Sequence, residues 1–452
     1  MLIEFRVSNY RSIGDEQVIS FVPAPKQRDY PSNIFTRGNY KALNVIGLYG
    51  ANGSGKSNLL RSMSVFDKIL HLSARTSSTA RLPYDPFLLR EGWENKPTKF
   101  EITFLAGEDK KYRYGFEYNQ DEIVAEWLYR KSLGREVSLF LRQRDVIDVS
   151  SAFNKEGKSS AKLFDAAVEA TRPNALFLSF CDTFNIEEAK LIFQWFKYFY
   201  MIDGLNTGAE GWQTVDIWNK SEEGKEQITD YLKRIKDLGI AFVNVTSKDF
   251  NIADLPEGMN DDVRNALVRE LSGKKGYSIF AGHELYSAEG NPTGKHLSWK
   301  IQERESAGTN KIFHLIGPIL RILSQGGVLI IDELEAKMHP HLTLDTINLF
   351  LHEDTNPNHA QLIFATHDTN LLTYSSLRRD QIYFTEKNEW ESTEAYSLSD
   401  FVYLGENGGV AARERPDTDK EKRYIEGRYG AVPVLGNFQF HFQTSDADGK
   451  EG

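Results

Sequence analysis

The sequence predicts an α/β fold in which a mixed sheet is flanked by helices, with an antiparallel β subdomain and a helical insertion. Apolar runs of strand length, at 44–49, 328–331 and 362–365, alternate with helical patterns, as in sheets whose strands are buried on both faces. Short runs of alternating polarity occupy 99–142, which is typical of antiparallel strands. Helical periodicity extends from about 166 to 271.

The N-terminal part of the chain carries the first predicted strands and the first helix. Its patterns predict strands at 2–7, 17–22 and 44–49, and a helix at 57–72 after a glycine-rich turn. The alternating runs between 99 and 142 are separated by polar turns, so we expect an antiparallel sheet of two to four strands there.

The middle of the chain is predicted to be an all-helical insertion. Its helices are expected at 186–201, 223–238 and 261–271. Beyond it, the patterns predict strands at 277–286, 296–302, 328–331 and 362–365, and helices at 309–323 and 342–351. These elements divide the chain into an N-terminal lobe (1–165), a helical insertion (166–275), a C-terminal lobe (276–400) and a tail (401–452).

The composition excludes several classes of protein. The 452 residues include 54 basic and 64 acidic side chains, and this net charge of -10 argues against coating long stretches of nucleic acid. The single cysteine, Cys181, cannot form a disulfide within the chain, and no secretory signal is visible. The sequence contains no window of about 18 apolar residues, the length that a membrane-spanning helix needs. We expect a cytoplasmic protein without a membrane partner.

The segment Gly50-Ala-Asn-Gly-Ser-Gly-Lys-Ser57 matches the phosphate-binding loop (P-loop) pattern and lies between a buried strand and a helix. Its glycines let backbone amides and the helix N-terminus face phosphate groups. Lys56 would reach the β- and γ-phosphates of ATP, and the Ser57 hydroxyl would hold Mg²⁺. The alternative is a chance match, expected in roughly one or two chains in a hundred of this length before the flanking elements are considered.

Two adjacent acids, Asp332 and Glu333, end a later buried strand. Charge in such a place is costly unless it meets a cation or hydrogen-bond donors, so a metal ion is its natural partner. Asp332 would anchor the Mg²⁺ shell, and Glu333 would orient or deprotonate the attacking water. His367 follows the next buried strand, where a neutral imidazole could bond the γ-phosphate. The alternative for the two acids is a solvated strand end, and the alternative for His367 is a solvated histidine or one whose hydrogen bonds are satisfied in the core.

The order of these motifs resembles that of the ABC-type P-loop ATPases found in SMC, RecF and OLD proteins. The opening Phe5-Arg-Val-Ser-Asn-Tyr-Arg-Ser-Ile13 is similar to the first strand and turn of that group, and Ser306-Ala-Gly-Thr309 stands in the place of its signature motif. Ser306 precedes a predicted helix, as an N-cap does. A second anion-binding helix start cannot easily reach its own P-loop, so the resemblance implies an ATP-sandwiched homodimer or a higher even-numbered oligomer.

The resemblance also implies a set of site residues. The catalytic residues are Glu333, His367 and Lys56; ATP is bound by Arg11, Ser12, Asn52, Gly53, Ser54, Gly55, Lys56, Ser57 and Asn58; Ser306, Gly308 and Thr309 act in trans; and Mg²⁺ is held by Ser57 and Asp332. The sequence departs from the group in two ways. Its signature is poorer in glycine and lacks the leading leucine, and no glutamine loop is evident after the P-loop helix.

Within that group, the chain resembles a narrower bacterial set, the small ATPases of PARIS-type and RloA-type phage-defence systems. The resemblance rests on the length, the short insertion, the Glu-Ser-Ala-Gly-Thr form of the signature and the tail from Lys422 to Pro433. It implies a slow ATPase that serves as sensor and scaffold. Its partners would be a Toprim nuclease, held inactive, and a phage protein that triggers release.

Other functions are weighed against this one. A RecF-like or SMC-like DNA-repair ATPase would clamp DNA on dimerisation; the net charge and the lack of long heptads weigh against the SMC form, and direct contact with nucleic acid stays open. A GTPase is disfavoured, because the nearest match to the guanine-recognition pattern Asn-Lys-x-Asp is Asn219-Lys-Ser-Glu222. A small-molecule kinase would not need the acid pair, the histidine and the second anion-binding turn together.

Overall fold

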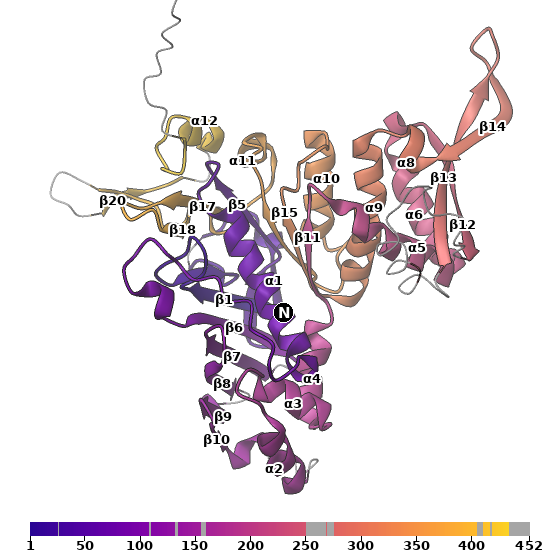
Figure 1. The fold of residues 1–452 in the computed structure, drawn as a ribbon. Helices are drawn as coiled ribbons and strands as arrows, with labels where there is room; N and C mark the ends of the chain where they lie inside the picture. The colour runs from indigo at the N-terminus through magenta and orange to yellow at the C-terminus, as the bar shows by residue number, and fades with distance from the viewer. Residues whose placement is uncertain are drawn as a thin grey trace, which may run out of the picture.

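The structure is a computed structural model in which two large sheets and the helices packed on them form the body of the molecule (Figure 1). It describes residues 1–25, 27–107, 110–131, 134–154, 160–249, 268, 275–404, 410–415 and 418–433. None of the helices in these ranges is long and apolar enough to cross a membrane.

A six-stranded sheet carries the sequence motifs at one edge. Its strands, in spatial order, are β11 (Phe199–Asp203), β15 (Val328–Asp332), β16 (Gln361–Ala365), β5 (Val45–Gly50), β17 (Ile382–Lys387) and β18 (Thr393–Ser397). The first five strands are parallel and β18 is antiparallel to β17, so the predicted mixed sheet is confirmed. Because the carboxyl ends of parallel strands share one edge, the segments after β5, β15 and β16 meet there.

Helices cover both faces of this sheet. Helix α1 (Lys56–Leu72) packs on the face that includes Ile46 and Ile330, whereas α9 (Ala307–Gln325) and α10 (Pro340–Leu351) pack on the face that includes Val45 and Ile331. Every residue of β5, β15 and β16 is buried. This double coverage explains why these strands are continuous apolar runs in the sequence.

A seven-stranded antiparallel sheet forms the second layer. In spatial order it comprises β10 (Val146–Val149), β9 (Val137–Gln143), β8 (Ile123–Lys131), β7 (Lys110–Tyr118), β6 (Thr98–Ala106), β1 (Leu2–Ser8) and β2 (Gln17–Ser20). Residues 99–142 supply four of these strands, β6 to β9, which confirms the predicted antiparallel sheet of two to four strands there; β1, β2 and β10 extend it to seven. Strand β1 pairs with β6 across about a hundred residues of sequence, a contact that local patterns do not encode.

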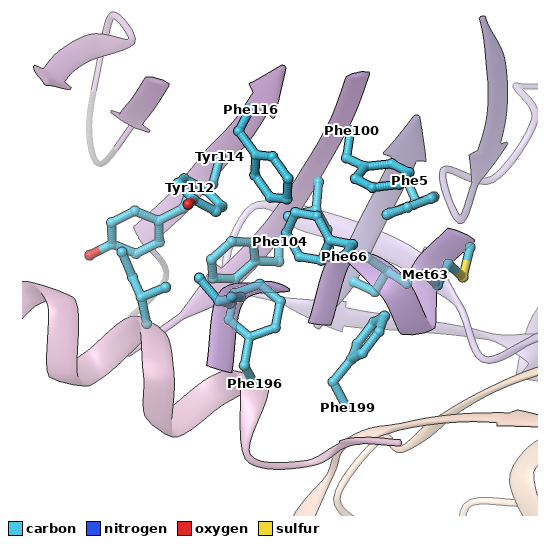
Figure 2. Close-up of a cluster of buried hydrophobic side chains, with 14 of the residues drawn as sticks. Phe5, Met63, Phe66, Phe100, Phe104, Tyr112, Tyr114, Phe116, Phe196 and Phe199 are labelled. Atoms are coloured by element: carbon cyan, nitrogen blue, oxygen red, sulfur yellow. The ribbon is translucent and has the colours of Figure 1, made fainter. Parts of the chain in front are cut away.

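Aromatic side chains fill the space between the antiparallel sheet and α1 (Figure 2). Phe66 of α1 packs edge-on against Phe5 and Phe100, with ring centroids 5.9 and 6.2 Å apart, and stacks on Phe116 at 5.4 Å. Phe196, from the helix α4 (Glu187–Phe196), closes the cluster at 5.7 Å from Phe66. Edge-to-face and stacked pairs of this kind fix the position of α1, and with it the loop at its N-terminus.

The segment predicted as all-helical is only partly so. It contains α2 (Ala161–Ala170), α3 (Phe177–Thr183), α4, α5 (Gly211–Lys220) and α6 (Glu222–Arg234), but Phe199–Asp203 forms β11 and Ile240–Asp249 forms β12. The prediction is wrong at β11 because a short apolar run looks the same in a buried helix and in a buried strand. Apart from residue 268, the helix predicted at 261–271 lies outside the described residues.

The remaining elements are smaller. Strands β12, β13 (Lys275–Tyr286) and β14 (Pro292–Lys300) form an antiparallel sheet that leads through α8 (Ile301–Arg304) into α9. The other elements are β3 (Ile34–Arg37), β4 (Tyr40–Leu43), α11 (Asn370–Tyr374), β19 (Val402–Leu404), β20 (Val410–Arg413) and α12 (Lys420–Ile425). The tail therefore contains secondary structure, which its polar sequence did not predict.

Candidate active site

The P-loop connects β5 to α1 and adopts backbone angles that favour glycine. Gly53 and Gly55 have φ values of 79° and 109°, in the left-handed region. A Cβ atom at Gly55 would overlap the side chain of Thr393, whereas one at Gly53 would meet no atom within 4 Å. The loop is thus tightly packed at the start of α1 and open at its tip, as a cradle for phosphate groups requires.

Lys56 is the first residue of α1 and is only 5% exposed. Its Nζ donates hydrogen bonds to the carbonyl oxygens of Gly50, at 2.8 Å, and Ala51, at 3.2 Å. Burial lowers the pKa of Lys56 to about 8, although the nearby charges of Asp332, Glu335 and Glu333 raise it. A cation held only by uncharged oxygens gains strongly from a phosphate group, so the geometry suits the predicted role.

Ser57 and Asp332 lie side by side beneath the P-loop. The Ser57 hydroxyl donates to Asp332 Oδ1 at 3.1 Å, although 275 residues separate the two in sequence. Burial raises the pKa of Asp332, while the hydrogen bond from Ser57 lowers it. A hydroxyl and a buried carboxylate are hard oxygen ligands, the donors that Mg²⁺ prefers, so the pair fits the predicted metal role.

Glu333 follows Asp332 in a constrained conformation. Its φ is 50°, uncommon for a residue other than glycine, and the side chain is half-buried. Burial raises the pKa of its carboxyl, and the negative charges of Asp332, Glu335 and Asp203 raise it further. The backbone is held by Lys311 Nζ, which donates to the carbonyl oxygens of Glu333, Leu334 and Ala336 at 3.2, 2.9 and 2.8 Å. A raised pKa is the usual property of a general base.

The His367 loop lies next to the P-loop on the sheet edge. The His367 backbone N–H donates to Glu335 Oε1 at 2.7 Å, and its side chain is exposed. Partial desolvation of the ring by its neighbours and the positive charge of Lys56 lower the pKa of His367, which favours the neutral imidazole. Residues 50–54 and His367 line one cavity of about 650 Å³. The structure thus brings the predicted histidine to the P-loop.

Arg11 and Ser12 pack beside the start of α1. Ser12 Oγ accepts a hydrogen bond from Asn58 Nδ2 at 2.8 Å, and Arg11 donates to Asn58 Oδ1 at 3.3 Å. Arg11 also donates to Asp85 Oδ2 at 2.7 Å. The three predicted residues therefore form one group at the helix N-terminus, within reach of the P-loop.

The signature residues lie at the start of α9. Ser306 is the N-cap, and its Oγ accepts a hydrogen bond from the Thr309 backbone N–H at 3.0 Å, as predicted. Gly308 allows close packing, because a Cβ there would lie 2.7 Å from the carbonyl oxygen of Lys337. Residues around this helix start line a separate cavity of about 460 Å³, which shares no lining residue with the cavity at the P-loop. The signature is thus not part of its own chain's P-loop cavity.

Several residues of the site were not identified from the sequence. Thr393 Oγ1 donates to the carbonyl oxygen of Ser54 at 2.9 Å and bonds Ser12 Oγ at 2.8 Å, while Thr385 Oγ1 bonds Ser54 Oγ at 2.7 Å. Lys311 also belongs to this group, as described above. No motif marks these positions, since threonines of strands β17 and β18 reach the P-loop only through sheet pairing.

No curated protein matches the sequence. Among solved structures, the chain is similar to the recombination mediator protein RecF of the RecFOR pathway, as RecF-ATPrS (14% identity, 87% of this chain and 98% of that chain, TM-score 0.34) and as RecF-ATP (13% identity, 82% and 94%, TM-score 0.31). Likenesses at this level transfer no role from RecF.

A family model described as "AAA domain, putative AbiEii toxin, Type IV TA system" matches residues 45–180 and 223–373. The matched ranges contain the P-loop, the signature residues, the Asp332–Glu333 pair and His367. Since they span more than half of the chain, the protein belongs to this AAA-domain family.

Proposed function

We propose that the protein binds MgATP at the P-loop and hydrolyses it slowly. The observation that carries this proposal is the contact between Ser57 and Asp332, which joins the P-loop helix to the acidic strand end at 3.1 Å. Around that contact lie one buried cation, Lys56, one carboxyl with a raised pKa, Glu333, and one neutral imidazole, His367. Lys56 is the candidate for phosphate binding, Glu333 for activation of water, and His367 for sensing of the γ-phosphate.

The residues divide the work as follows. The loop amides and Lys56 bind the phosphates, with Lys56 exchanging the carbonyl oxygens of Gly50 and Ala51 for phosphate oxygens. Ser57 and Asp332 would hold Mg²⁺, which neutralises charge on the β- and γ-phosphates. Glu333 orients a water molecule and accepts its proton, and neutral His367 donates a hydrogen bond to the γ-phosphate.

The proposed active form is a homodimer or a higher even-numbered oligomer. Ser306, Gly308 and Thr309 lie at a helix start whose neighbours Ala307 and Asn310 line a cavity separate from the chain's own P-loop cavity. A second copy can bring that helix start over the γ-phosphate, which completes the site across an interface. Two copies related by a twofold axis would form two such sites.

In the cell, we propose that this ATPase is the sensor and scaffold of a phage-defence complex, restraining a Toprim nuclease until a phage protein is recognised. Two observations support a role of this kind. The family description refers to a toxin–antitoxin system. The net charge of -10 favours protein partners over a long nucleic acid.

The test of the ATPase is the variant Glu333→Gln, with Glu353→Gln, an exposed glutamate outside the site, as its matched control. Loss of the base should lower turnover by about 10²-fold while the thermal shift caused by MgATP is retained. Light scattering should show that Glu333→Gln accumulates an oligomer with MgATP. Unchanged turnover in this variant, or a lack of any MgATP-dependent thermal shift in the wild-type protein, would contradict the proposal.

A further inference from the structure

Residues 418–433 of the C-terminal tail lie against the segment that follows His367. Its helix α12 contacts α11, the first helix after the histidine. Both carboxylate oxygens of Glu421 accept hydrogen bonds from this segment: Oε1 from Thr369 Oγ1 at 2.8 Å and Oε2 from Thr373 Oγ1 at 3.2 Å. One side chain of the tail therefore holds two positions, one helical turn apart, directly after the histidine.

The other side of the His367 loop is held by the segment after β15. The His367 N–H donates to Glu335 Oε1 at 2.7 Å, and the Leu334 N–H donates to the carbonyl oxygen of Ala365 at 3.1 Å. The backbone that carries the imidazole is thus fixed between two carboxylates, Glu335 and Glu421, from different parts of the chain. Removal of either one would release one end of the loop.

The tail segment itself is anchored on the sheet that carries the P-loop. The rings of Tyr424 and Tyr429 stack on Phe384 of β17, with centroids 5.2 and 5.4 Å apart. The Ala431 N–H donates to Glu386 Oε2, also on β17, at 2.9 Å. Strand β17 pairs with β5, which ends at the P-loop. Glu421 therefore acts from a rigid support, which a positioning residue needs.

The same segment also borders the space in front of the P-loop. Tyr424 and residues 431–433 line the cavity of about 650 Å³ together with residues 50–54 and His367. The family match ends at residue 373, so it does not include this part of the wall.

We propose that Glu421 is a positioning residue for His367: through Thr369 and Thr373 it holds the histidine loop against the P-loop cavity, so that the C-terminal tail sets the rate of ATP turnover. This inference rests on the proposed ATPase function. Glu421 does not contact Lys56 or the loop amides, so its loss affects the chemical step rather than the binding of MgATP.

The experiment compares the steady-state kinetics of four variants: Glu421→Ala, Glu421→Gln, His367→Ala and the double variant Glu421→Ala/His367→Ala. A small misplacement of an active-site group costs roughly one to two orders of magnitude in rate, so Glu421→Ala should lower kcat about tenfold or more. KM and the thermal shift with MgATP should remain within about twofold of the wild-type values. Glu421→Gln keeps one carbonyl oxygen as an acceptor and should recover part of the loss. The matched control is Glu426→Gln, an exposed position on the same segment.

The double variant distinguishes positioning from general destabilisation. If Glu421 acts through His367, the double variant should be no slower than His367→Ala alone, because the second change has nothing left to displace. Additive losses in kcat, or an unchanged kcat in Glu421→Ala, would overturn the inference. Failure of the proposed ATPase has a different signature: the Lys56→Ala protein would turn over ATP as fast as the wild type, whatever Glu421 does.

Discussion

Replacement of Lys56 by methionine should stabilise the nucleotide-free protein while abolishing its response to MgATP. Burial lowers the pKa of Lys56 from 10.5 to about 8, so keeping the charge in the folded state costs about 3 kcal/mol at about 1.4 kcal/mol per pKa unit. Methionine has a similar shape and no charge, but it loses the hydrogen bonds to Gly50 and Ala51, which offsets about 1 to 2 kcal/mol. The net gain is about 1 to 2 kcal/mol, a rise of a few degrees in Tm.

The stability difference between Lys56→Met and the wild type should change with pH in a defined direction. In the unfolded chain the lysine keeps its proton up to a pH near 10.5, whereas in the folded protein it loses the proton near its pKa of about 8. Between these values the unfolded state binds more protons, so the wild-type protein gains stability as pH rises. The Lys56→Met variant lacks this gain. Its advantage should be complete below about pH 8, should vanish between the two pKa values, and should become a deficit of about 1 to 2 kcal/mol near pH 10.5, where only the lost hydrogen bonds remain.

The assay is urea unfolding of both proteins at pH 7 and pH 10, with thermal shifts measured with and without MgATP. Lys68→Met is the matched control, since Lys68 is exposed on the same helix. A Lys56→Met protein that is less stable than the wild type at pH 7, or whose difference in unfolding free energy does not change with pH, would refute the reasoning.

Three further predictions concern packing. Gly55→Ala should abolish the MgATP-induced thermal shift, because its Cβ would overlap a threonine side chain and the left-handed φ is unfavourable; retained binding would contradict the described loop. Arg142→Met should lower the free energy of unfolding by about 3 to 5 kcal/mol in urea titrations, because the buried Glu126 carboxylate would lose its ion-pair partner at 3.5 Å and keep only hydrogen bonds from uncharged donors. A loss below about 1 kcal/mol would show that the ion pair does not stabilise the fold. Gly308→Ala should slow ATP turnover without changing the thermal shift with MgATP, because a Cβ there lies 2.7 Å from the Lys337 carbonyl oxygen; unchanged turnover would show that this contact can relax.

Strands with a distinctive local sequence pattern could be predicted. Sheet membership that depends on pairing between distant parts of the chain could not. Strands β5, β15 and β16 are buried on both faces, so their apolar runs identified them. Strand β11 has a run of the same kind, but it follows α4 after two residues, and periodicity could not separate them. Strand β1 joins the antiparallel sheet by pairing with β6, which no short window of sequence contains, and β2 joins it through β1.

The same distinction applies to the site. Residues 50–57, Asp332 and His367 stand at the ends of predictable strands, and the structure brings them to one sheet edge. Thr393 and Glu421 reach the site from sequence positions without a motif, and their types are common on any surface. Their roles follow from hydrogen bonds to specific partners, which only the folded chain defines.

Lys311 connects the helix start at Ser306 to the loop that carries Glu333. Lys311 lies at the start of the second turn of α9, is 2% exposed, and donates to three carbonyl oxygens of the segment from Glu333 to Ala336. Burial lowers the pKa of Lys311 to about 8, and only these carbonyl oxygens and the nearby carboxylates offset that cost. The helix that Ser306 caps and the loop that carries Glu333 are therefore held as one unit. In the proposed oligomer, a shift of Ser306 toward a partner's γ-phosphate would also move the backbone of Glu333, so the two sites of a dimer would not act independently.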